Sequence, residues 1–346
     1  MNYGMSLFMK GLNKMKKIFY ALTLCLSICI LSACSTEKQA YSKTDFCFDT
    51  AVTLTIYDTA SNADNANALL DEAITLCHSY DDMFSRTKEG SDIYRINTSG
   101  GEWTTVSDET ISLIQSALEY CEMTGGQIDI TIAPVKDLWN FSGTEDVKMP
   151  ATADIETQLS HVGYSQIEIQ GNKVRLKDPQ AAIDLGFIAK GYVADQARAL
   201  LLKHGAKSAL INLGGNIAVI GEKPDGSAFQ IGIQKPFAPA GTYCATVSAS
   251  QSVTGTSSVV TSGTYERCFE HNGKLYHHIL DSKTGKPAQT DLSGVTIITD
   301  SSLHADALST TCLLLGLDQG VSYIEKLDDV EAVFVTVDGE IVDTRK

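Results

Sequence analysis

The sequence is poor in basic residues. Its 27 lysines and arginines stand against 42 aspartates and glutamates, which gives a formal net charge of −15. This balance leaves no basic footprint for a nucleic acid, so we expect no nucleic-acid partner. The sequence also has no P-loop, no G-x-G-x-x-G segment and no repeat of solenoid period. A phosphate ligand would therefore have to be held by a metal ion or by backbone amides.

Long apolar runs are also missing. The run from Ile18 to Leu31 is too short for a membrane-spanning helix, which needs about 20 residues. It follows a lysine-rich start and ends in Leu31-Ser-Ala-Cys34, the order of a bacterial lipoprotein signal. We expect residues 1–33 to be a signal peptide and Cys34 to carry the lipid, with an ordinary secretory signal as the alternative. Met15 is an alternative start.

The remaining chain divides into a short tether and a catalytic domain. We expect residues 34–44 to be the lipidated cysteine and a polar tether, and residues 45–346 to form the domain. Its six cysteines lack the tight spacing of a zinc site: Cys47, Cys77, Cys121, Cys244, Cys268 and Cys312. Several lie at apolar-periodic positions, which favours buried free thiols over disulfides.

Periodicity predicts a mixture of helices and strands. Strands are expected at 52–57, 208–213, 243–247, 295–298 and 330–337, with a hairpin at 167–176. Helices are expected at 65–84, around 111–121, and at 191–204, 303–315 and 318–327. Because the two types do not alternate regularly, we predict an α+β fold with mixed or antiparallel sheets and packed helices. It would be one catalytic unit, with room for two subdomains.

Two segments carry polar residues next to apolar stretches, where buried apolar residues alone would be expected. Asp184 follows an apolar approach, and Lys190 comes six residues later, just before a predicted helix. A purely structural explanation serves equally well: Asp184 would complement the dipole at the start of the helix, and Lys190 would be exposed to solvent. In Asn212-Leu-Gly-Gly-Asn216, the double glycine permits close approach of a ligand to the backbone, or simply makes a tight turn.

Two further segments suggest chemistry. His277 and His278 are adjacent in a short predicted strand, so they should point to opposite faces. His278, with Asp281 three residues on, could serve as a base near neutral pH. Asp306 and Thr310 share a face of a predicted helix, and their oxygens suit Mg²⁺. The alternatives are that His278 is a structural histidine and that the Thr310 hydroxyl bonds to a carbonyl of its own helix.

Taken together, the segments resemble one family over nearly all of the mature chain. They are Asp82–Asn97, Gly126-Gln-Ile-Asp129 through Trp139, Ile183-Asp184-Leu-Gly through Lys190-Gly191, Asn212–Asn216, Thr261-Ser-Gly263 through Tyr265-Glu-Arg267 with Tyr276–Gly285, and Ala305-Asp306-Ala-Leu-Ser-Thr310. In this order they are similar to the motifs of the ApbE family, the FAD:protein FMN transferases.

The resemblance implies a reaction and a set of site residues. Such enzymes use Mg²⁺, take FAD as substrate, attach its FMN half to a Ser or Thr hydroxyl of a target protein and release AMP. The implied metal ligands are the Phe187 carbonyl, Asp306 and Thr310. The implied FAD contacts are Phe48, Gln127, Ile128, Asp129, Asp184, Lys190 and His278. His278, assisted by Asp281, would act in the transfer.

The chain departs from the family pattern at several of these positions. Thr87 and Ile128 stand where many relatives carry aromatic residues, and Phe187 replaces a small residue. Phe48-Asp49-Thr50 replaces the usual Met-Gly-Thr. None of these changes removes a proposed catalytic side chain.

The resemblance also implies partners and a location. The acceptor would be a flavoprotein, such as a flavin-bearing subunit of an Rnf-type or Nqr-type complex or an extracellular electron-transfer flavoprotein. The enzyme would sit on the outer side of the cell membrane through its lipid anchor. Two other functions stay open: a Mg²⁺-dependent FAD pyrophosphatase that releases FMN and AMP, and a flavin- or solute-binding lipoprotein without turnover.

Overall fold

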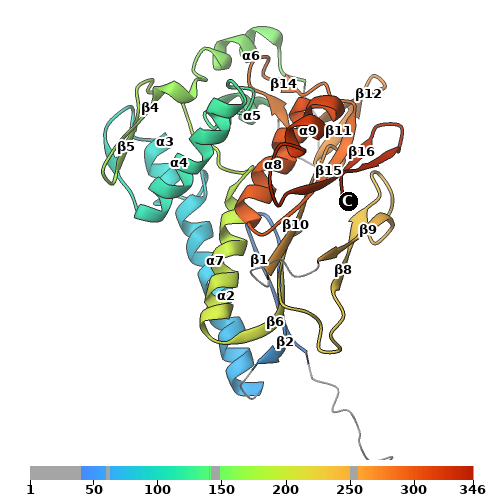
Figure 1. Cartoon of the computed structure of the whole chain (residues 1–346). Coiled ribbons are helices and arrows are strands. Elements are labelled where there is room, and N and C mark those ends of the chain that lie inside the picture. The colour runs from blue at the N-terminus through green and yellow to red at the C-terminus, as the bar shows by residue number, and fades with distance from the viewer. Residues whose placement is uncertain (1–39, 60–62, 140, 142–148, 250–255, 346) are drawn as a thin grey trace, which may run out of the picture. The chain divides into compact units, whose positions relative to one another are not determined.

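The central element of the computed structural model is a sheet of eight strands in the order β1-β2-β6-β7-β10-β15-β16-β17 (Figure 1). The strands span Tyr41–Cys47 (β1), Thr50–Thr59 (β2), Ala206–Leu213 (β6), Asn216–Ile220 (β7), Thr256–Gly263 (β10), Leu292–Thr299 (β15), Glu331–Thr336 (β16) and Ile341–Asp343 (β17). Each neighbouring pair is antiparallel. This arrangement confirms the predicted α+β class.

Both faces of the sheet are buried, because successive side chains of a strand point to opposite faces. Ala218 and Val260 belong to the large core, whereas their neighbours Val219 and Val259 belong to a second core on the other face. The second core is closed by a hairpin of β8 (Phe229–Gln234) and β9 (Tyr243–Ala249), drawn in gold in Figure 1.

Helices cover the face of the sheet that carries the large core. Helix α2 (Ala63–Phe84) packs beside α7 (Ala189–Lys203), and α8 (Ser302–Leu315) lies against β10 and β15 (Figure 1). The others are α3 (Asp92–Asn97), α4 (Asp108–Met123), α5 (Ala133–Trp139), α6 (Thr152–Leu159), α9 (Leu317–Ile324) and the 3₁₀ turn η1 (Tyr164–Gln166). Most side chains of α8 are buried, so a charged residue within it needs partners from neighbouring elements.

Three further small sheets lie outside the large one. They are the hairpin β11 (Cys268–His271) with β12 (Lys274–His277), the hairpin β13 (Leu280–Asp281) with β14 (Lys286–Pro287), and β3 (Thr104–Thr105), β5 (Lys173–Leu176) and β4 (Ile167–Gln170). The β4–β5 pair is the predicted hairpin, and Gly171 in its turn has a φ of 58°. This left-handed backbone explains the glycine there.

Most predicted elements are present with boundaries shifted by a few residues, and three of the differences matter here. Strand β1 begins at Tyr41, so residues 41–44 pair with β2 instead of serving as tether. Their polar side chains resemble a linker because β1 is an edge strand with an exposed face. Lys190 is the second residue of α7, not a residue before it, and α9 ends at Ile324. The six predicted free thiols are free.

The structure describes residues 40–59, 63–139, 141, 149–249 and 256–345. The predicted signal peptide 1–33 and Cys34 lie outside the described residues. Within the described ranges, no helix combines the length and apolar character needed to cross a membrane.

Candidate active site

Asp306 is a carboxylate inside a largely buried helix, and its partners come from the start of α7. The residue is only 3% exposed. Its Oδ2 accepts a hydrogen bond from the Gly191 amide at 2.9 Å, and its Oδ1 lies 3.7 Å from Nζ of Lys190. Burial raises the pKa of Asp306, while the charge of Lys190 opposes that rise. The structure therefore brings together two of the predicted site residues.

Gly191 permits this close approach of α7 to α8. A Cβ at position 191 would lie 2.3 Å from the Ser302 carbonyl oxygen and 2.7 Å from the Cβ of Asp306. In a continuous helix, the Gly191 amide would bond to the carbonyl of Phe187, four residues earlier. Because α7 begins at Ala189, Phe187 lies outside the helix, and the amide donates to Asp306 instead.

Thr310 lies one turn after Asp306 and completes the predicted set of oxygen donors. Its Oγ1 is 3.0 Å from Oγ of Ser262, at the end of β10, and that Oγ is 2.7 Å from Oγ of Ser309. Carboxylate, hydroxyl and carbonyl oxygens suit Mg²⁺. The described residues contain no cluster of three or more His, Cys, Asp or Glu that could hold a metal. A cation here would rely on one carboxylate, neutral oxygens, water and ligand phosphates.

Two turns of the sheet reach the same region. The two-residue turn between β1 and β2 has positive φ at Phe48 (53°) and Asp49 (55°), which is costly for residues other than glycine. A Cβ at Gly214, in the β6–β7 turn, would lie 2.2 Å from Oγ1 of Thr50, so the turns touch. Asn216 follows that turn, and its buried side chain interacts with Asp306, whose pKa this contact lowers.

Asp184 belongs to a second ionic cluster. Its Oδ2 lies 2.7 Å from Nζ of Lys136 and 3.1 Å from Nε of Arg86, and its Oδ1 accepts the Gly186 amide at 2.8 Å. Arg86 also makes two hydrogen bonds with Asp137. Burial alone would raise the pKa of Asp184, but Lys136, the Gly186 amide and Arg86 outweigh it and lower the pKa to about 2. The carboxylate is therefore ionised at neutral pH.

His278 follows the end of β12 and faces the backbone of Arg267. Its Nδ1 lies 3.3 Å from the Arg267 carbonyl oxygen. A carbonyl can only accept, so Nδ1 carries the proton and Nε2 keeps a free lone pair. Burial lowers the pKa of His278, and the charges of Arg267 and Lys136 lower it further. The neutral imidazole can therefore accept a proton at Nε2.

The neighbouring residues have other roles. His277, expected to point away from the cleft, is 5% exposed, and its Nε2 lies 3.1 Å from the Ala288 carbonyl oxygen. Strand β12 ends there, so His277 is the interior residue and His278 leaves the strand. Asp281 uses Oδ1 to accept the Lys283 amide at 2.8 Å. This contact supports the β13–β14 turn.

Residues 127–129 form a well-supported turn. Nε2 of Gln127 donates to the Leu314 carbonyl, and Ile128 is 6% exposed. Asp129 accepts hydrogen bonds from the amides of Thr131 and Tyr164. The two side chains at 128 and 129 thus serve packing and the turn, and the amide of Ile128 is bonded to Oγ1 of Thr124. Thr87 bonds locally to Oγ of Ser85.

One short segment connects His278 to the predicted metal ligands Asp306 and Thr310. In this 262–267 segment, Ser262 contacts Thr310, and the Arg267 carbonyl accepts the His278 amide at 3.0 Å. Glu266 lies within electrostatic reach of both Lys190 and Asp306. The segment therefore holds the oxygen donors and the imidazole in one arrangement.

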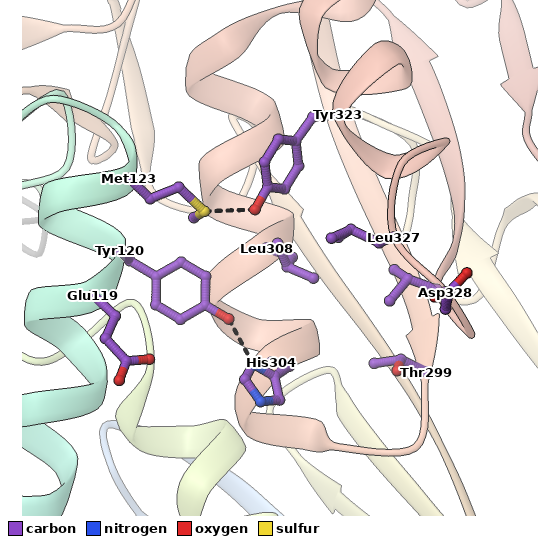
Figure 2. Close-up of a pocket in the computed structure, with 10 residues that line it drawn as sticks. Glu119, Tyr120, Met123, Thr299, His304, Leu308, Tyr323, Leu327 and Asp328 are labelled. Carbon is purple, nitrogen blue, oxygen red and sulfur yellow. Dashed lines mark hydrogen bonds between the residues drawn. The ribbon is translucent and has the colours of Figure 1, made fainter.

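A separate hollow of about 380 Å³ lies between α4, α8 and α9 (Figure 2). Figure 2 shows the Tyr120 hydroxyl pointing to His304 Nδ1, at 2.7 Å, and the Tyr323 hydroxyl pointing to Sδ of Met123. His304 and Leu308 line it from α8, two positions before Asp306 and Thr310. Two positions turn a helix by about 200°, so the hollow and the predicted metal ligands use opposite faces of α8.

Several residues of the site were missed by sequence reasoning. Arg86 and Lys136 lie in segments that carry the family resemblance, but nothing in the sequence pairs them with Asp184. Ser262 and Arg267 act through a hydroxyl and a carbonyl that many residue types could supply. Only Asn216 could be suspected from the local sequence, because it follows two consecutive glycines.

The chain and its fold have counterparts among known proteins. Residues 48–334 match the ApbE family. FAD:protein FMN transferases from Klebsiella pneumoniae (strain 342) and Treponema pallidum are 33% and 30% identical over 309 and 332 residues, which cover 88% and 91% of this chain and 92% and 90% of theirs. The crystal structure of an ApbE protein from Thermotoga maritima has a TM-score of 0.80 at 32% identity and covers 89% of this chain and 97% of that one.

These matches extend over most of the chain and of each relative. The chain belongs to the ApbE family.

The Asp184 cluster generates a prediction for stability. Asp184→Asn should lower the free energy of unfolding at pH 7 by about 2 kcal/mol, because a carboxyl pKa reduced from 3.8 to about 2 stabilises the fold by that order. The depressed pKa contributes stability above pH 4, and this is lost as the pH falls through about 2. Urea unfolding of both proteins between pH 3 and pH 7 measures the difference, which should narrow at the acid end.

Asp137→Asn is the matched control, since Asp137 shares Arg86 but its side chain is 57% exposed. We expect it to cost well under 1 kcal/mol. Equal stability of the Asp184→Asn variant and the wild type at pH 7 would contradict the prediction.

Proposed function

We propose that the chain transfers the FMN part of FAD to a Ser or Thr hydroxyl of an acceptor flavoprotein and releases AMP. The relatives named FAD:protein FMN transferase support this reaction. The observation that carries it is the convergence of Asp306, Thr310 and Lys190 at one end of the 262–267 segment with a neutral His278 at the other.

In the proposed reaction, the acceptor oxygen attacks the phosphorus of the FMN phosphate. The bond from that phosphorus to the bridging oxygen breaks, and AMP leaves with that oxygen. His278 accepts the hydroxyl proton at Nε2, while its Nδ1 stays on the Arg267 carbonyl. Lys190 lies where it can attract the pyrophosphate.

The site residues fit a Mg²⁺ ion. Asp306, Thr310 and the carbonyl of Phe187 would hold it, because a carboxylate, a hydroxyl and a carbonyl are the oxygen ligands that Mg²⁺ prefers. When bound, Mg²⁺ would neutralise charge on the pyrophosphate and orient the phosphorus for attack.

The direct test mixes the full-length protein in mild detergent with FAD, Mg²⁺ and the purified flavin-bearing subunit of an Nqr-type complex. Flavin fluorescence on the denatured acceptor, with release of AMP, would demonstrate transfer. Free FMN and AMP without a labelled acceptor would instead identify a FAD pyrophosphatase. If neither product forms, the remaining function is that of a flavin-binding lipoprotein without turnover.

His278→Ala should slow FMN transfer by about 10²- to 10⁴-fold, the usual contribution of a general base. The affinity for FAD, measured by fluorescence quenching, should change little. His271→Ala is the control, because His271 is an exposed histidine of β11. A loss of FAD affinity without a change in single-turnover rate would make His278 a binding residue and contradict its role as base.

Thr310→Val should weaken the apparent affinity for Mg²⁺ about 10-fold, since it removes one neutral ligand. Asp306→Asn should weaken it further, because it removes the only charged ligand yet keeps an acceptor for the Gly191 amide. Mg²⁺ titration of AMP release, with calorimetric titration of Mg²⁺ into the FAD complex, measures both. Unaltered Mg²⁺ dependence in folded variants would speak against this site.

We also propose that the chain is anchored at the outer side of the cell membrane through a lipid, a palmitate-bearing modification, on Cys34. Cys34→Ala should then release the protein from membranes or block its processing. Cys29→Ala, within the expected signal peptide, should leave both unchanged. The check is fractionation with immunoblotting, and normal retention and processing of Cys34→Ala would rule out the anchor.

A further inference from the structure

The hairpin β8–β9 ends in an exposed aromatic ring. Phe237 is 61% exposed, and its backbone has a φ of 58°, which is unfavourable for a residue with a side chain. A large apolar side chain on a strained backbone is a feature that natural surfaces retain where it serves binding.

The loop that carries this ring is held rigid. Nε2 of Gln234 donates to the carbonyls of Lys235, Ala238 and Pro239, and its Oε1 accepts the Gly241 amide at 3.0 Å. The Lys235 amide also donates to the Thr242 carbonyl at 2.7 Å. One side chain thus fixes the loop, which lowers the entropy cost of any contact that Phe237 makes.

Phe237 lies against the centre of the 262–267 segment. Its ring centroid is 6.0 Å from that of Tyr265, in an edge-to-face arrangement. The Tyr265 ring covers Gly263, where a Cβ would lie 2.3 Å from it. Ser262 contacts Thr310 on one side of Tyr265, and Arg267 contacts His278 on the other. The exposed ring therefore borders the place where the proposed transfer occurs.

The charges of the loop also differ from those of the whole chain. Residues 234–243 contain one basic residue, Lys235, and no acidic residue, whereas the chain has a net charge of −15. A polypeptide that approaches here meets an apolar surface without the general negative charge of the protein.

We infer that Phe237 and Tyr265 form a docking surface for the acceptor polypeptide, and that they receive an apolar side chain close to the Ser or Thr that becomes flavinylated. This inference rests on the proposed function. Tyr265 lies two residues before Arg267, whose carbonyl oxygen contacts His278, so the chain itself links this surface to the residue that has to meet the acceptor hydroxyl. An aromatic anchor at such a position is typical of the few residues that dominate binding.

The test uses the full-length protein, FAD, Mg²⁺ and the purified flavin-bearing subunit of an Nqr-type complex as acceptor. Phe237→Ala should raise the KM for the acceptor about 10-fold or more, the cost of truncating a binding hot spot. The kcat at saturating acceptor and the affinity for FAD should stay near wild-type values. Leu202→Ala removes an apolar side chain that is 44% exposed on α7 and should leave the KM unchanged.

Phe237→Gly separates docking from packing. Glycine accepts the positive φ, so the Tm should equal or exceed that of the wild type while the KM rises as in Phe237→Ala. A lower Tm together with the higher KM would make the ring a packing element and overturn the inference. An unchanged KM in both variants would overturn it as well.

Two results that assign the Phe237–Tyr265 surface to another ligand would also contradict docking of the acceptor there. If FAD affinity falls with the ring, Phe237 contacts the flavin. If light scattering shows that the wild type is a dimer and Phe237→Ala a monomer, the surface joins two copies of the chain. A wild type that labels no acceptor would overturn the proposed function and this inference together, whereas variants that match an active wild type would overturn the inference alone.

Discussion

The contact between Asp306 and the Gly191 amide is the constraint on which the site depends. It locks the beginning of α7 onto the middle of α8, at a distance that only glycine allows. The same contact sets Lys190 beside the carboxylate. A single hydrogen bond thereby joins two helices and positions a cation.

Around this contact, several basic side chains of this acidic protein lie in ion pairs with the carboxylates of the site. Lys190, Lys136 and Arg86 are each paired with a carboxylate, and Arg267 stands beside the histidine. Pairing with Asp184 and Asp306 keeps these cations in place without a substrate. Burial lowers the pKa of His278, and the charges of Arg267 and Lys136 lower it further, so two of these cations also help to keep the imidazole neutral.

Much of the fold followed from the sequence, because the helices and strands have clear periods and the family motifs occur in order. The i, i+4 spacing of Asp306 and Thr310 placed them on one helix face, as the structure has them. The spacing could not reveal Lys136 and Arg86, since their pairing with Asp184 depends on tertiary contacts across distant segments. The sequence pattern also placed both histidines in one strand, whereas β12 ends at His277 and His278 lies just beyond it.

The order of strands in the sheet has a consequence for folding. Strand β2 lies between β1 and β6, so Val52 pairs with Leu213, and a long stretch of chain must be looped out before that edge closes. The pairs among β15, β16 and β17 join residues much nearer in sequence. We expect the C-terminal edge to form early and the N-terminal edge late. Because Phe48 belongs to the late edge and Asp306 to a helix packed on β10 and β15, we expect the two residues to come together only when that edge closes.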